Sequence, residues 1–179
     1  EQDNFRTYVH LSTGNYNQTT SRLYTDVGFF TSNSEFGKDA ALLFNYLTSY
    51  SHPSDWKHFS VAPITLYQKL MYLIDREIEK STPENPGLIF AKMNQLAHRD
   101  LIPKLYQASL SGVKIQLLVR GVCCLRPGIP DVSENIEVRS ILGRFLEHSR
   151  IFYFKNGGEG EFYLSSADWM SRNLHNRVE

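Results

Sequence analysis

Apolar and polar residues follow two different periods along the chain, and these periods predict both strands and helices. Residues 5–11 and 23–31 are rich in β-branched and aromatic side chains, which predicts two strands. Residues 39–50 have the apolar content of a helix, and Asn33 or Ser34 before them is a suitable N-terminal cap. The first 50 residues therefore predict a small unit of two strands and one helix.

A stretch with turn-forming residues follows, and a second unit begins after it. Residues 49–57 contain Ser, His and Pro, and we interpret them as a linker between two domains, 1–58 and 59–179. Residues 60–63 predict a short strand and turn. Residues 66–80 carry an apolar stripe at helical spacing, with charged residues predicted on the opposite side: Asp75, Arg76, Glu77, Glu79 and Lys80.

The middle of the second unit has the pattern of a strand, a helix and a second strand. The strands are predicted over 88–93 and 113–119, and the helix over 100–111, ending at Gly112. This order within about 30 residues predicts a parallel pair joined by a right-handed crossover. The fold class is therefore α/β.

The last part of the chain predicts more strands. Residues 136–140 are a predicted strand, and 143–147 a short helical turn leading to His148. Residues 150–155 and 161–164 predict a hairpin around Asn-Gly-Gly. The chain does not begin with Met and ends in a strand-like segment, 176–179, so we expect a piece of a longer protein.

Composition restricts the possible function classes. Hydrophobic residues make up 41% and aromatic residues 13%, values that exclude a disordered chain. A formal net charge of zero gives no general reason to expect nucleic acid as a partner. Cys123 and Cys124 are adjacent and fit no zinc spacing, which favours a reducing, cytosolic setting.

One short pattern occurs twice, 153 residues apart. Residues 11–16 are Leu-Ser-Thr-Gly-Asn-Tyr, and residues 164–169 are Leu-Ser-Ser-Ala-Asp-Trp. Each follows a predicted strand. The second copy has His148 seventeen residues upstream of its serine, whereas the same offset from Ser12 falls before residue 1. His10 aligns with Tyr163 and not with His148, so we interpret His10 as structural.

The second copy contains the candidate catalytic residues. An imidazole such as that of His148 can act as a nucleophile toward phosphorus or as a general acid or base near neutral pH. Arg150 shares its strand face and has the forked geometry that holds phosphoryl oxygens. Ser165, Ser166 and Asp168 supply hydroxyl donors and a carboxylate that we expect to orient the imidazole.

Two further residues are candidates for ligand contact. Arg120 follows the strand over 113–119, and ligands of α/β sheets bind at the carboxyl ends of strands. Tyr24 is predicted to share a strand face with Arg22 and Asp26, although a half-buried strand tyrosine is the simpler interpretation.

The sequence resembles the phospholipase D superfamily. Its members have two halves, and each half carries a histidine and a basic residue followed by a hydroxyl-rich element. Within it the sequence is most similar to the type 1 bacterial polyphosphate kinase family. The matching stretches are residues 10–17 (His-Leu-Ser-Thr-Gly-Asn-Tyr-Asn), 21–26 (Ser-Arg-Leu-Tyr-Thr-Asp), 117–123 (Leu-Leu-Val-Arg-Gly-Val-Cys), 145–150 (Phe-Leu-Glu-His-Ser-Arg) and 163–173 (Tyr-Leu-Ser-Ser-Ala-Asp-Trp-Met-Ser-Arg-Asn).

The resemblance implies a fold of two tandem phospholipase D-like domains, each with a mixed sheet flanked by helices. Residues 1–58 would be the tail of the first domain and 59–179 most of the second. The implied reaction moves the terminal phosphate of ATP reversibly onto inorganic polyphosphate through a phosphohistidine. The phosphorylated histidine and the arginines associated with Mg²⁺ would lie before residue 1, so no metal ligand is expected within this chain.

The resemblance also implies roles and partners. Tyr24, Arg120 and His148 match nucleotide-contacting positions, and His148 would be the second histidine of the pair. Arg150, Ser165, Ser166, Asp168 and Asn15 would support the site. ATP, ADP and polyphosphate are the implied partners, without nucleic acid. A homo-oligomer in the cytosol is expected for the longer protein, with membrane association as an alternative.

Two alternatives stay open. One is a phosphodiesterase or nuclease of the same superfamily, although Arg150 stands where those enzymes usually have Lys. The other is a catalytically inactive module that binds nucleotide or polyanion. Six cationic residues are candidates for a polyphosphate path, with a solvated surface as the competing interpretation: Lys92, Arg120, Arg126, Arg144, Arg150 and Arg172. We expect the 179-residue chain alone to be inactive.

Overall fold

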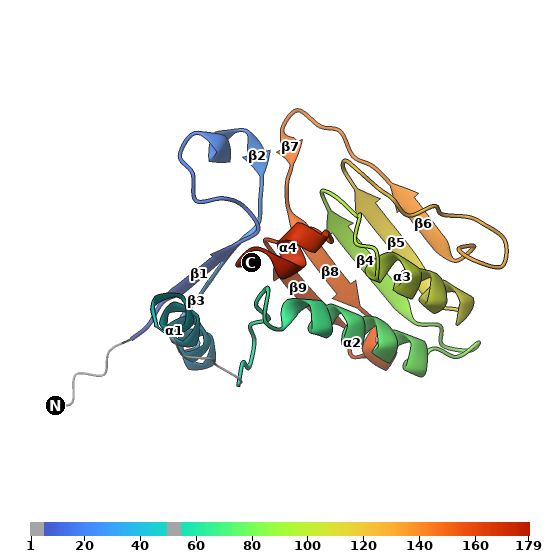
Figure 1. Cartoon of the computed structure of the whole chain (residues 1–179), viewed down its shortest axis with the longest axis horizontal. Coiled ribbons are helices and arrows are strands. Elements are labelled where there is room, and N and C mark those ends of the chain that lie inside the picture. Colours follow the sequence, from blue (N-terminus) through green and yellow to red (C-terminus); the bar gives the residue numbers. More distant parts are fainter. Residues whose placement is uncertain (1–5, 50–54) are drawn as a thin grey trace.

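Figure 1 shows the computed structural model of the chain, which describes residues 6–49 and 55–179. Residues 50–54 of the predicted linker, and residue 5 of the first predicted strand, lie outside the described residues. The strands are β1 (Val9–Ser12), β2 (Tyr24–Thr25), β3 (Gly28–Thr31), β4 (Leu88–Met93), β5 (Lys114–Val119), β6 (Ile136–Arg139), β7 (Leu146–Glu147), β8 (Arg150–Phe154) and β9 (Glu161–Ser165). The helices are α1 (Ser34–Thr48), α2 (Leu66–Lys80), α3 (Leu101–Leu110) and α4 (Ser171–His175), with short 3-10 turns η1 (Thr20–Arg22) and η2 (Asn156–Gly158).

A five-stranded mixed sheet forms the centre of the second unit, in the order β6-β5-β4-β8-β9. The strand pairs β4–β5 and β5–β6 are parallel, whereas β8 is antiparallel to both β4 and β9. The predicted crossover from β4 through α3 to β5 and the predicted β8–β9 hairpin are confirmed. The parallel strands end at one edge of the sheet, beside the start of β8.

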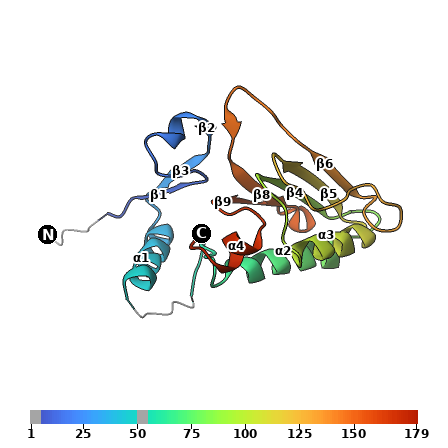
Figure 2. The same cartoon turned by 45° about the horizontal axis from the view of Figure 1, so that its top comes forward.

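Helices α2 and α3 cover the same face of this sheet (Figure 2). The apolar stripe of α2 faces the strands, with Leu66, Leu70, Leu73 and Ile74 buried. It packs into one core cluster with residues from α3 and the sheet. Helix α3 ends at Leu110, and Gly112, the predicted stop, follows its C-cap with a φ of 81° that suits a residue without a Cβ atom.

Glu77 departs from the predicted polar face of α2, because its side chain is buried. Its carboxylate accepts hydrogen bonds from the backbone N–H of Leu88 (3.2 Å) and of Asn156 (2.6 Å). These two donors begin β4 and η2. A buried carboxylate is tolerated here because it is paired with donors that would otherwise be unsatisfied.

The first unit consists of the antiparallel pair β1–β3 and helix α1. Asn33 caps α1, as expected, by accepting a hydrogen bond from the N–H of Glu35 (2.8 Å). The helix begins at Ser34, five residues before the predicted start. The buried carboxylate of Asp39 accepts from the N–H of Lys57, His58 and Phe59 at 2.7–3.2 Å, which fixes α1 to the segment leading into the second unit.

Four predicted segments were wrong in detail. The strand over 23–31 is divided into β2 and β3, because β2 pairs with β7 whereas β3 pairs with β1. Residues 143–147 form no helical turn; they lead into β7, a short strand parallel to β2. Residues 60–63 form a turn without a strand, and 176–179 are not a strand.

In the described parts of the chain, no helix has both the length and the apolar character to cross a membrane.

Candidate functional site

His148 lies where the two units meet. Strands β2 and β7 pair in parallel, with Tyr24 opposite Leu146 and Thr25 opposite Glu147. The backbone N–H of His148 continues this ladder by donating to the carbonyl of Thr25 (3.1 Å). The histidine is thereby placed against residues that are more than 120 positions earlier in the sequence.

Two residues of the first unit fix the imidazole of His148. Nδ1 lies 2.9 Å from Oδ1 of Asp26, and the ring stacks on Tyr24 with 4.5 Å between centroids and 19° between planes. A carboxylate accepts hydrogen bonds, so Nδ1 carries the proton in the neutral ring and Nε2 carries the lone pair. His148 is 9% exposed and is thus held in one orientation with one defined basic nitrogen.

The Asp26 carboxylate is itself held in place. Buried Thr13 donates its hydroxyl to Asp26 Oδ1 (3.0 Å) and accepts from the N–H of Val27 (3.0 Å). A Cβ atom on Gly14 would lie 2.1 Å from Asp26 Oδ2, so only glycine leaves room for this carboxylate. The loop after β1 therefore shapes the position of Asp26.

Arg150 is buried beside the imidazole and is fully engaged by protein atoms. Its guanidinium makes a bidentate pair with Asp168, with Nε 3.2 Å from Oδ1 and Nη2 3.0 Å from Oδ2. Nη1 donates to the carbonyls of Thr13 (2.9 Å) and His148 (3.1 Å) and lies 3.2 Å from both ring nitrogens of His148. Arg150 thus connects the two units under the histidine.

The predicted role of Asp168 is therefore wrong. Its carboxylate does not meet the imidazole; it binds Arg150 and accepts from the N–H of Asn94 (2.7 Å) and of Gln95 (3.3 Å). The carboxylate at the imidazole belongs to Asp26 instead. Asp168 anchors the loop after β4 to β8, and it acts on His148 only through Arg150.

Arg120 lies at the carboxyl end of β5, as predicted. Its backbone N–H donates to the carbonyl of Met93 (3.2 Å), and its carbonyl accepts from the Ser140 hydroxyl (3.1 Å). Its Nη1 atom is buried, and no hydrogen-bond partner is present among the described residues. An unpaired buried guanidinium donor is costly, and an anionic ligand would satisfy it.

The repeated elements have one geometric feature in common. Ser12 Oγ accepts from the N–H of Gly14 and Ser165 Oγ accepts from the N–H of Ala167, both at 3.0 Å. Their other members differ. Ser166 donates to the Glu179 carboxylate (2.6 Å), outside the cluster around His148.

The remaining predicted residues contribute no contact to this cluster. Asn15 is exposed, and so are Arg126, Arg144 and Arg172 of the predicted polyphosphate path. Lys92 pairs with Glu147 (3.1 Å) and also contacts Ser149. His10 binds the Tyr16 hydroxyl through Nδ1 (2.8 Å), away from the cluster.

Asp26 and Thr13 are the site residues that the sequence analysis missed. The predicted strand face that joins Tyr24 to Asp26 was a signal for Asp26, since both residues now contact His148. Thr13 belongs to the first repeated element, and its burial gave no separate signal. Among the described residues no group of three or more His, Cys, Asp or Glu side chains is arranged to hold a metal ion.

Comparisons with known proteins place this geometry in a family. Residues 59–179 match the family described as Polyphosphate kinase C-terminal domain 2, and residues 1–53 match Polyphosphate kinase C-terminal domain 1. The chain is 54% identical to a polyphosphate kinase of Halalkalibacterium halodurans over 99% of its own length and 25% of the relative's. It is 56% identical to one of Bacillus anthracis over 96% of its length and 24% of the relative's.

A solved structure agrees with these matches. The crystal structure of polyphosphate kinase from Porphyromonas gingivalis superimposes with a TM-score of 0.91 and 43% identity, covering 97% of this chain and 26% of that one. The chain thus spans about a quarter of the length of the relatives it matches. By sequence and by fold, it belongs to the polyphosphate kinase family.

Proposed function

We propose that this chain is part of an enzyme that transfers the terminal phosphoryl group of ATP reversibly to inorganic polyphosphate. Family membership supports the reaction class, and the fixed imidazole of His148 is the observation that carries the assignment to this site. Tyr24, Arg120 and His148 are the proposed nucleotide contacts. Residues 1–58 and 59–179 are proposed as parts of two tandem domains, and the ranges of the two family matches support this division.

His148 is the proposed acid/base partner of a phosphorylated histidine that the family resemblance puts before residue 1. With Nδ1 on Asp26, Nε2 is the nitrogen that can take up or release a proton. Tyr24 covers one face of the ring and restricts its motion. Arg120 offers its unpaired Nη1 to phosphate oxygens, where charge accumulates during phosphoryl transfer.

Arg150 is proposed as a positioning residue, in place of the direct phosphate contact expected from sequence. Its N–H groups are directed at Asp168, Thr13 and His148. Arg150 thereby holds the ring of His148 in place between the two units.

Mg²⁺ is expected as the partner of ATP, and ADP as the product. The carboxylates of Asp26 and Asp168 are both occupied by protein groups. In the part of the chain that the structure describes, no group of three or more His, Cys, Asp or Glu side chains is arranged to hold the ion. The two free adjacent cysteines support a reducing, cytosolic location as a further proposal.

The test uses the full-length protein that carries this chain and measures transfer of labelled terminal phosphate from ATP to polyphosphate. We expect His148→Ala to lower the rate by about 10²–10⁴-fold, the range of a lost general acid or base. His10→Ala should retain substantial activity, because His10 contacts Tyr16 and not the cluster. Equal losses in both variants would contradict the assignment of His148. Phosphodiester hydrolysis without phosphate transfer would favour the nuclease alternative.

A further inference from the structure

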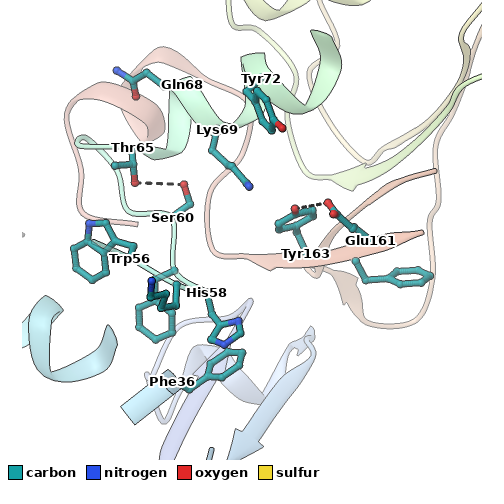
Figure 3. Close-up of a pocket in the computed structure, with 13 residues that line it drawn as sticks. Phe36, Trp56, His58, Ser60, Thr65, Gln68, Lys69, Tyr72, Glu161 and Tyr163 are labelled. Carbon is teal, nitrogen blue, oxygen red and sulfur yellow. Dashed lines mark hydrogen bonds between the residues drawn. The ribbon is translucent and has the colours of Figure 1, made fainter. Parts of the chain in front are cut away.

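A cavity lies apart from the His148 cluster and shares no lining residue with it. It has a volume of about 640 Å³ and is bounded by the start of α1, residues 56–60, the first half of α2 and strand β9 (Figure 3). The residues that surround it come from both units. Nothing in the proposed reaction uses this cavity.

Aromatic side chains form most of its wall. Phe36 stacks on His58 with 4.3 Å between ring centroids, and Trp56 lies nearly parallel to Phe59 with a centroid distance of 6.4 Å and an angle of 11°. Tyr72, Phe162 and Tyr163 form the opposite side. Flat rings on two sides of a cavity suit a planar aromatic ligand, because such rings stack on the faces of a base.

Lys69 is the charged group that this cavity leaves available. Its ammonium lies over the rings of Tyr72 (5.6 Å) and Tyr163 (5.8 Å) and extends into the cavity (Figure 3). No ion pair joins it to a carboxylate within residues 6–49 and 55–179. Its charge acts on the Glu161 carboxylate without a direct ion pair, so the ammonium can also contact an anionic ligand.

The neighbouring charges are already paired. The Glu161 carboxylate accepts two hydrogen bonds from Arg76 (3.1 and 2.8 Å) and one from the Tyr163 hydroxyl (2.7 Å). The hydrogen bonds from Arg76, above all, and from Tyr163 keep its pKa below the ordinary value, with a smaller contribution from the charge of Lys69, so Glu161 stays an anion. At the rim, Lys57 faces Asp55 (3.7 Å) and His58 faces Glu35 (2.9 Å).

We infer that this cavity is a second nucleotide-binding site, which takes the planar base and a phosphate of a nucleoside phosphate. The base lies among the rings of Trp56, Phe59 and Tyr163, and Lys69 contacts the phosphate. Ser60, Thr65 and Gln68 line the same cavity and supply polar groups for the ribose or the base edge. A polyphosphate chain fits less well, because its many charges would meet one free ammonium and several apolar rings.

The test is the stoichiometry of ADP binding to the full-length protein, measured by equilibrium dialysis with labelled ADP. Lys69→Gln and Trp56→Ala are each expected to remove one ADP per chain, or to weaken that site at least tenfold. The exposed Lys114, on β5, provides the matched control, and Lys114→Gln should leave the stoichiometry unchanged. Thermal unfolding identifies any variant that fails to fold. If Trp56→Ala fails to fold, the result for Lys69→Gln, which replaces an ammonium with a neutral amide, decides the test.

Two outcomes would overturn the inference. One is an ADP stoichiometry that is the same in wild type, Lys69→Gln and Trp56→Ala. The other is a Lys69-dependent site that binds tripolyphosphate as tightly as ADP, since the base would then add nothing. A variant at the first site, Tyr24→Ala, separates this test from that of the proposed reaction, because it should weaken a different ADP site and leave the Lys69-dependent one intact.

Discussion

The position of one carboxylate, Asp26, determines what His148 can do. The imidazole was identified from sequence because a histidine, an arginine and a hydroxyl-rich element occur together in the second repeat. The carboxylate that contacts this imidazole was not identified from sequence. Asp26 is 122 positions away and reaches His148 only because β2 and β7 pair. Asp168 was the nearer carboxylate in sequence, but the guanidinium of Arg150 is a stronger, bidentate partner for it.

Gly14 provides a test of this arrangement without altering any group that contacts His148. A methyl group at this position would lie 2.1 Å from Asp26 Oδ2 and push the carboxylate away from the imidazole. We therefore expect Gly14→Ala to lower the phosphate-transfer rate of the full-length enzyme by about 10–100-fold, a partial loss of the general acid/base contribution.

Asp26→Asn is the companion variant for this prediction. It should also lower the rate, since it removes the charged acceptor that fixes the ring tautomer. Gly128→Ala is the steric control, because a Cβ atom there meets nothing within 4 Å, although its φ of 70° adds some backbone strain. Full activity of Gly14→Ala would mean that the Asp26 contact is dispensable.

At the scale of elements, hydrophobic periodicity predicted the second unit well. The strand over 88–93, the helix over 66–80 and the β8–β9 hairpin were confirmed because their side chains face one core with regular spacing. Periodicity failed for β2 and β7. Each has two residues, too few to display a period, and they exist because they pair with each other. Glu77 was misplaced because backbone donors from other elements surround it.

Removal of the Glu77 carboxylate should destabilise the protein measurably. Glu77→Ala leaves the buried N–H groups of Leu88 and Asn156 without acceptors, which costs about 1–3 kcal/mol. Glu77→Gln retains one acceptor oxygen and should cost less. Thermal unfolding followed by circular dichroism tests this order, with the exposed Glu79→Ala as control, expected within about 0.5 kcal/mol of wild type. A similar loss in Glu77→Ala and Glu79→Ala would refute it.

His98 connects α3 to α4 and makes the stability depend on pH. Its Nδ1 accepts from the N–H of Asp100 (3.2 Å) and Leu101 (3.4 Å), and its Nε2 lies 3.0 Å from Nε2 of His175. Burial and the neighbouring His175 lower the pKa of His98 below its ordinary 6.5. As the pH falls below about 6.5, His98 takes up a proton more readily in the unfolded chain than in the folded chain. The free energy of unfolding therefore decreases as the pH falls further.

The corresponding measurement is the denaturation midpoint between pH 8 and pH 5. Wild type should lose stability over this range, and His98→Gln, which does not titrate, should show a flatter profile. Parallel profiles for wild type and His98→Gln would show that another group is responsible.

At the scale of the whole molecule, the site is shared between two units. Thr13, Tyr24 and Asp26 come from the first, and His148, Arg150 and Asp168 come from the second. Sequence analysis predicted this division from the repeat and the family resemblance, but it gave no register between the units. That register depends on long-range contacts such as Arg150 with the Thr13 carbonyl.

The 179-residue chain alone should not synthesise polyphosphate. The family resemblance assigns the phosphorylated histidine to a position before residue 1, so His148 would have no phosphoryl donor to assist. Assays of the purified chain and of the full-length protein with labelled ATP, at equal molar concentration, test this prediction. Robust polyphosphate formation by the chain would contradict it.

The two-residue pairing of β2 with β7 also determines the order in which the molecule loses its properties. The cluster around His148 depends on this short ladder, whereas the five-stranded sheet is sustained by a large buried core. Local opening with few buried apolar contacts needs less free energy than global unfolding. Mild denaturant should therefore separate Tyr24 and Asp26 from His148 while the sheet is still protected from hydrogen exchange. We therefore expect the site around His148 to come apart at a lower denaturant concentration than the one that unfolds the sheet.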